Sequence, residues 1–317
     1  MATSLYDKGF YINRSFEELC LTEPQAVREV TKAFKSAGAE LLCTNTFNAL
    51  EPKLMKHGIQ DQLEDILKAS VKIAKEVAGD DAYVMASMGP LGLVLEPLGP
   101  TSAAQAYSYF EKNIRVFENE NIDGYALSGF HDLQELVIGI KAIRDVSTKP
   151  IVANIGIQED LKTSYGHRLE SFVKKAELLK VNAIGLSGEV GPSGMLTALE
   201  ALRPMTNLPI CILPNAGMPR YVNDQYIYLC NPDYIGKYAK RYIQAGANIV
   251  GGHCGVGEQH IQAISNALRM TSAAAPESFK ISEIVKPPID EPTTIIPLKD
   301  RSKLGAALAS GQRIISV

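Results

Sequence analysis

His253 and Cys254 stand side by side in the stretch VGGHCGVGEQHI, residues 250–261, and both side chain types can bind a metal ion. An apolar run precedes the pair and a helical pattern begins at about Gly257, so we expect the two residues to lie between the end of a strand and the start of a helix. The flanking glycines allow both side chains to reach inward. The pair is therefore either half of a metal site or a rim histidine beside an inert thiol, and the second interpretation is favoured.

Composition excludes several classes of protein. The chain has 317 residues, a formal net charge of -3 and 46% hydrophobic residues, values that are ordinary for a globular protein. That charge favours neither nucleic acid nor a membrane surface as a partner. No apolar run reaches the roughly 18 residues that a membrane span needs. The start, MATSLYDKGFYINRS, lacks the apolar core of a secretory signal.

Five cysteines are scattered along the chain and form no disulfide framework, so a cytoplasmic location is expected. They are Cys20, Cys43, Cys211, Cys230 and Cys254.

Seven apolar runs alternate with amphipathic stretches, and each run is apolar throughout, as a strand buried on both faces should be. The runs are 39–47, 82–90, 123–130, 150–157, 182–189, 208–216 and 247–255. Their starts are about 35 residues apart, the size of one βα unit. The pattern predicts an α/β protein with a (β/α)8 TIM barrel.

The first strand of that barrel is missing or displaced, because residues 1–23 contain no convincing strand. The barrel domain is expected to cover residues 1–272. A Pro-rich C-terminal extension follows, with 273–302 as a linker. Residues 303–317, KLGAALASGQRIISV, predict the start of a further domain or a C-terminal tail.

Active sites of such barrels lie at the carboxyl ends of the strands. Cys43, Asn45, Ser128 and Asn215 fall there and are the candidate substrate-binding residues. Each has a plainer interpretation, as a core thiol or as a residue that shapes the loop. Cys43 lies in an apolar run, so a core role is the first expectation for it.

Several motifs resemble the homocysteine S-methyltransferase family. They are TNTF (44–47), SMGPLG (87–92), GP (191–192), PNAG (214–217) and GGxCG (251–255), and they occur in the order typical of the family. Residues 4–47 resemble the subgroup in which this barrel is fused to a methylenetetrahydrofolate reductase. Residues 301–317 resemble the opening of that reductase domain.

The resemblance implies a zinc ion held by three cysteines, one after the sixth strand and two after the eighth. Zinc lowers the thiol pKa of homocysteine, and the thiolate attacks a methyl group. Here Ser187-Gly188 replaces the first cysteine motif and His253-Cys254 the pair. Glu189, one residue past the lost cysteine, is the candidate third ligand beside His253 and Cys254, and Cys43 is an alternative.

The acidic residues that hold the amino acid in the family are also replaced. Ser128-Gly129 stands where the family has Glu-Thr, and Cys43 precedes TNTF in place of a glutamate. The methyl donor, whether a methylated corrinoid, a folate or a sulfonium, is not fixed by the sequence.

Three functions remain open. The first is methyl transfer to homocysteine or another thiol, in one-carbon and methionine metabolism, with altered or lost zinc dependence. The second is a catalytically silent barrel that docks a methylenetetrahydrofolate reductase domain or subunit. The third is an enzyme with a different, less cationic substrate, since Ser128 and Cys43 offer no carboxylate to an ammonium group.

Overall fold

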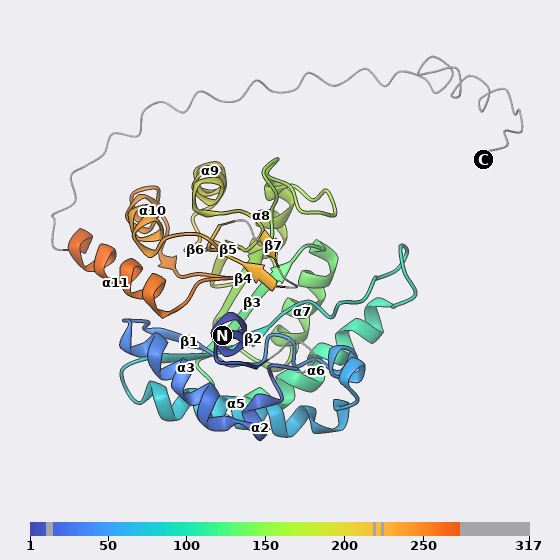
Figure 1. Ribbon diagram of the computed structural model, residues 1–317. Coiled ribbons are helices and arrows are strands. Elements are labelled where there is room, and N and C mark those ends of the chain that lie inside the picture. The colour runs from blue at the N-terminus through green and yellow to red at the C-terminus, as the bar shows by residue number, and fades with distance from the viewer. Residues whose placement is uncertain (11–14, 218–219, 223–224, 273–317) are drawn as a thin grey trace, which may run out of the picture. The chain divides into compact units, whose positions relative to one another are not determined.

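A parallel sheet of seven strands forms the centre of the protein (Figure 1). The computed structural model describes residues 1–10, 15–217, 220–222 and 225–272. The strands are β1 (Leu41–Cys43), β2 (Tyr83–Met88), β3 (Gly124–Phe130), β4 (Ile151–Ile155), β5 (Ala183–Ser187), β6 (Ile210–Leu213) and β9 (Ile249–Val250). They pair in that order, and every pair is parallel. Each strand lies within one of the seven predicted runs.

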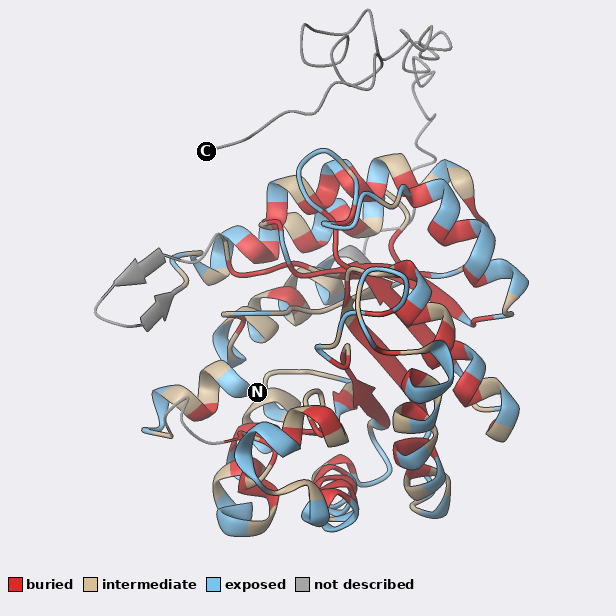
Figure 2. Ribbon diagram, turned by 90° about the vertical axis from the view of Figure 1, so that its right-hand side faces the viewer, coloured by how far each residue is buried: buried red, intermediate tan, exposed pale blue. Residues whose placement is uncertain are grey.

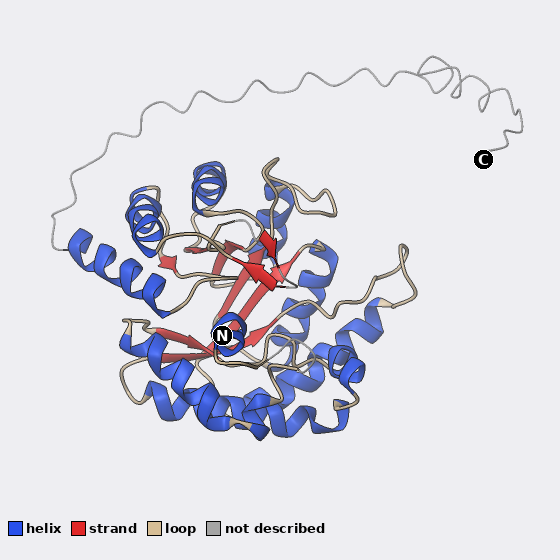
Figure 3. Cartoon of the chain, viewed as in Figure 1, coloured by secondary structure: helices blue, strands red, loops and turns tan. Residues whose placement is uncertain are grey.

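Helices lie between the strands, and in Figure 3 they surround the sheet. The longer ones are α3 (Pro24–Ser36), α5 (Leu63–Ala78), α6 (Ala103–Asn119), α7 (Leu133–Val146), α8 (Leu169–Leu178), α9 (Pro192–Leu202), α10 (Pro232–Gln244) and α11 (Glu258–Ser272). A short helix α4 (Glu51–Leu54) follows β1, and an antiparallel hairpin, β7 (Arg220–Val222) and β8 (Gln225–Ile227), follows β6.

Capping residues explain where several helices begin. Ser102 accepts a hydrogen bond from the backbone N–H of Gln105 and forms a capping box with it at the start of α6. Asn231 accepts a hydrogen bond from the N–H of Asp233, and Pro232 is the first residue of α10.

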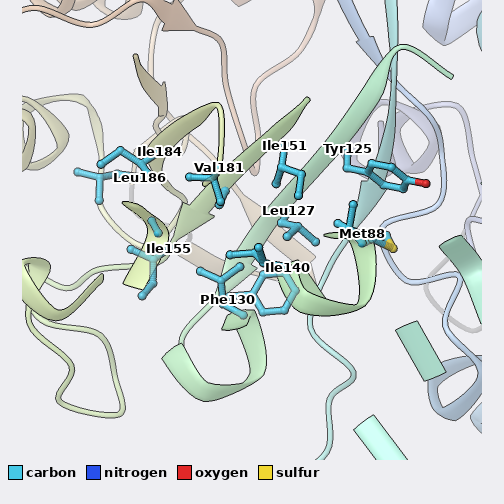
Figure 4. Packing of buried hydrophobic residues seen from close by; sticks show 14 of the residues in the cluster. Met88, Tyr125, Leu127, Phe130, Ile140, Ile151, Ile155, Val181, Ile184 and Leu186 are labelled. Atoms are coloured by element: carbon cyan, nitrogen blue, oxygen red, sulfur yellow. The ribbon is translucent and has the colours of Figure 1, made fainter. Parts of the chain in front are cut away.

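The two faces of the sheet bury different side chains. The helix-facing side packs large residues, and Figure 4 shows Leu127, Phe130 and Ile140 within this layer. The inner face carries at least one residue from each strand in a single cluster: Leu41, Met85, Ala126, Val152, Ala183, Cys211, Leu213 and Ile249. Because this cluster joins the first strand to the last, the sheet curls toward a barrel. Figure 2 shows the buried strands at its centre.

The predicted fold class is confirmed: this is a (β/α) barrel-type sheet of seven strands, with β1 and β9 at its edges. The described part of residues 1–23 holds two short helices, α1 (Ala2–Asp7) and α2 (Leu19–Thr22), and no strand. Leu5 of α1 is fully buried with Leu19. The Thr3 hydroxyl accepts a hydrogen bond from the Gly255 N–H at 3.3 Å, so α1 ties the start of the chain to the loop after β9.

Among the described residues, none of the helices is long and apolar enough to cross a membrane. The predicted linker, 273–302, and the reductase-like segment, 303–317, lie outside the described residues. The domain boundary and the reductase partner therefore remain predictions.

Candidate functional site

His253 and Cys254 lie in the loop between β9 and α11, at the carboxyl edge of the sheet. The His253 Nδ1 atom is 3.2 Å from the Cys254 Sγ atom. The backbone N–H of His253 donates to the Pro214 carbonyl at 2.9 Å, and the N–H of Cys254 donates to the Asn215 Oδ1 atom at 3.2 Å. Asn215, a predicted ligand contact, thus fixes the backbone at Cys254.

Poor solvation makes both side chains of the pair neutral at pH 7, although His253 is partly exposed and Cys254 is exposed. Loss of solvation lowers the pKa of His253 to about 4, and the positive charge of the chain's amino terminus adds to this effect. Burial also raises the pKa of Cys254, partly offset by a hydrogen bond from Tyr228, and the charge of Glu189 raises it further. Without a bound cation the pair therefore presents an imidazole and a protonated thiol.

Cys43 ends β1 at the same edge of the sheet. Its side chain is exposed, yet desolvation raises its pKa to about 11. An accessible thiol that is nevertheless poorly solvated is expected where surrounding protein limits the water around it. The exposure departs from the core role that the apolar run first predicts for this residue, and it leaves a role in ligand contact open.

Glu189, the predicted third metal ligand, interacts with a histidine that sequence reasoning missed. Its Oε1 atom lies 3.4 Å from the His131 Nε2 atom, and its backbone has a φ of 58°. His131 follows β3 directly, and its ring occupies the space next to Gly156, where a Cβ atom would come within 2.5 Å of it. The sequence could have indicated His131 as a site residue, because it directly follows the run that forms β3 and active sites of such barrels lie at strand ends.

Ser128 and Asn45 are both buried near the carboxyl ends of their strands. Ser128 lies near the end of β3, two residues after the inward-facing Ala126, and is buried. Asn45 is held within the protein: its N–H donates to the Ser70 hydroxyl at 2.7 Å, and its Nδ2 atom donates to the Phe16 carbonyl at 2.7 Å. Asn45 therefore joins the loop after β1 to its surroundings, and its role as a ligand contact remains a prediction.

Phe47 connects the site to neighbouring loops. Its ring meets the His253 ring edge-on, with centroids 5.9 Å apart. Gly89 and Gly129 leave room for it, since a Cβ atom at either position would come within 3.0 Å of the ring. The Lys53 ammonium lies over the Phe47 ring, 5.3 Å from its centroid, in a cation–π interaction.

The described residues do not fit a zinc site with three protein ligands. No group of three or more His, Cys, Asp or Glu side chains able to hold a metal ion occurs in the described ranges. His253 and Cys254 supply two donors, whereas Glu189 is paired with His131. Structural and catalytic zinc sites use at least three protein ligands.

Fold and site together define a barrel-type α/β protein with a candidate small-molecule site at the carboxyl ends of its strands. The homocysteine S-methyltransferase family model matches residues 1–268. The chain belongs to the homocysteine S-methyltransferase family, as the order of its motifs predicts.

Relatives cover the same part of the chain. Methionine synthase of Mycobacterium leprae is 26% identical over 259 residues, which are 78% of this chain and 21% of that protein. Betaine–homocysteine S-methyltransferase 1 of Rattus norvegicus is 25% identical over 276 residues, or 79% of this chain and 66% of that protein. The chain thus spans about a fifth of the length of the methionine synthase that it matches.

A solved structure shares the fold. The homocysteine methyltransferase MmuM from Escherichia coli, in its metallated form, superposes with a TM-score of 0.71 at 20% identity. The match covers 84% of this chain and 93% of that one.

Proposed function

We propose that the carboxyl edge of the sheet binds a small thiol or thioether compound, and that zinc-dependent methyl transfer to homocysteine is lost or strongly reduced. The observation that carries the proposal is the pairing of Glu189 with His131, which leaves His253 and Cys254 without a third metal ligand among the described residues. Membership of the family supports the ligand class, because the relatives' names refer to homocysteine and methionine.

The chemistry follows from the protonation of the substrate. A free thiol has a pKa of about 8.5, so only about 3% is thiolate at pH 7. A bound cation removes that limit by holding the thiolate. Without it, His253 is a weak base, because burial lowers its pKa to about 4. Ser128 and Cys43 replace carboxylates, so an ammonium group gains no charged partner from them.

Calorimetry with homocysteine and with methionine, with and without a zinc chelator, tests the proposal. We expect binding that the chelator does not change. Methyl transfer from a sulfonium, a folate or a methylated corrinoid should be absent, or slow with a rate that rises about tenfold for each unit of pH increase below the thiol pKa. Fast transfer that the chelator abolishes would overturn the proposal, and so would a failure of every thiol and thioether to bind.

A further inference from the structure

Two glycines on neighbouring strands create space that two polar side chains fill. Gly185 of β5 pairs with Asn154 of β4, and a Cβ atom at Gly185 would lie 2.3 Å from the Asn154 Oδ1 atom. At Gly156, just past the end of β4, a Cβ atom would lie 2.8 Å from the His131 Nδ1 atom. The Asn154 amide and the His131 ring therefore occupy positions that side chains of the strands would otherwise take.

Both positions face the inside of the curled sheet. Side chains alternate along a strand, and Val152 of β4 and Ala183 of β5 belong to the inner cluster. Asn154 and Gly156 share the face of Val152, and Gly185 shares that of Ala183. Asn154 and Gly156 are about 7 Å apart along the chain, so the amide and the imidazole occupy successive positions on this face.

Each of these side chains has one buried atom without a hydrogen-bond partner among the described residues: Asn154 Oδ1 and His131 Nδ1. Asn154 is 1% exposed. Its Nδ2 atom donates to the Leu127 carbonyl at 3.1 Å, which fixes the orientation of the amide and leaves Oδ1 as the free atom. A buried polar atom without a partner is costly, so two such atoms on one wall call for a ligand group that can pair with both.

The carboxylate of Glu189 determines the role of His131. Its Oε1 atom lies 3.4 Å from Nε2, which favours the proton on Nε2 and leaves Nδ1 as an acceptor. Two acceptors on adjacent positions match two donors on one ligand group. An ammonium ion is a poor match, because Glu189 is already paired and a buried charge without a partner is costly.

We propose that Asn154 and His131 form a subsite for an uncharged donor group, namely the NH2 of a primary carboxamide. The subsite lies in the candidate site, and the inference rests on the proposed function that thioether compounds bind there. In this proposal Asn154 and His131 determine specificity, because they favour a ligand that carries a primary amide over the corresponding free amino acid.

Binding of N-acetyl-L-methioninamide and of N-acetyl-L-methionine, measured by calorimetry, tests the proposal. The two probes differ only in amide against carboxylate. We expect the amide to bind at least about tenfold more tightly, equivalent to one hydrogen bond of about 1.4 kcal/mol. The variants Asn154→Leu and His131→Phe should each remove most of that preference for the amide over the acid.

Asn113→Leu is the matched control. Asn113 also has an unpartnered buried Oδ1 atom, but it lies on α6 and donates to the Ala49 carbonyl. This variant should keep the preference for the amide. If the wild type bound both probes with equal affinity, the subsite would be overturned. The proposed function would still stand in that case as long as homocysteine bound. If no thiol or thioether bound at all, both proposals would fall.

Discussion

Replacing Glu135 by glutamine should make the protein's stability less dependent on pH. Glu135 lies in the first turn of α7 and is 5% exposed. Its Oε1 atom accepts a hydrogen bond of 2.6 Å from the Leu91 N–H, in the loop after β2. Burial raises its pKa from 4.5 to about 7, with Asp132 adding to the effect and the Leu91 hydrogen bond and Lys53 opposing it.

The size and sign of the effect follow from that pKa. A rise from 4.5 to about 7 corresponds to roughly 3 kcal/mol in favour of the neutral form in the folded state. Because the folded pKa lies above the unfolded one, this stabilisation is complete below about pH 4.5 and is lost as the pH rises through 7. Glutamine is neutral at every pH and keeps an acceptor for the Leu91 N–H.

Urea unfolding of both proteins from about pH 4.5 to about pH 8 measures the difference. The wild type should lose roughly 3 kcal/mol relative to Glu135→Gln over this range, most of it below about pH 7.5. Lys53, whose pKa burial lowers to about 8, is present in both proteins, so its own titration largely cancels. Glu159→Gln, at an exposed position, is the control and should track the wild type. Parallel stability curves for Glu135→Gln and the wild type would refute the reasoning.

Three further outcomes are expected. Gly185→Ala should destabilise the protein by about 1–3 kcal/mol in urea unfolding, because the new Cβ atom would lie 2.0 Å from the Cys211 carbonyl oxygen. Gly139→Ala is the control and should not destabilise the protein, because its Cβ atom would have no neighbour closer than 3.7 Å. Equal losses of stability in the two variants would contradict this. Cys43 should react with iodoacetamide about a hundredfold more slowly than an ordinary thiol near pH 7.5, because its pKa is raised from 9.0 to about 11. Labelling followed by mass spectrometry measures the rate, and rapid labelling of Cys43 would contradict the expectation. His253 should remain neutral in a ¹H–¹³C NMR titration down to about pH 5, because burial lowers its pKa to about 4, and a midpoint near 6.5 would argue against that burial.

The order of the strands could be predicted from the sequence because runs buried on both faces stay apolar throughout. Their ends could not. The first run covers 39–47, but β1 is Leu41–Cys43, since Asn45 leaves the ladder and bonds to Ser70 instead. Apolar and small residues continue into the loop, and only tertiary partners show where pairing stops.

The candidate site was predictable where it depended on neighbours in the chain. The pair His253 and Cys254 is adjacent in the sequence and adjacent in space, at 3.2 Å. The contact between His131 and Glu189 joins two different strand ends, and the place of Asn154 depends on a glycine across the sheet. These relations require the register of β3, β4 and β5, which composition and periodicity do not supply.

Zinc content is the most direct test of the central claim that the site lacks metal activation. Mass spectrometry of the purified protein after incubation with zinc should give well under one zinc per chain, unchanged in His253→Ala and Cys254→Ala. One zinc per chain that both variants lose, and that Glu189→Gln also weakens, would contradict the account and restore zinc-dependent methyl transfer.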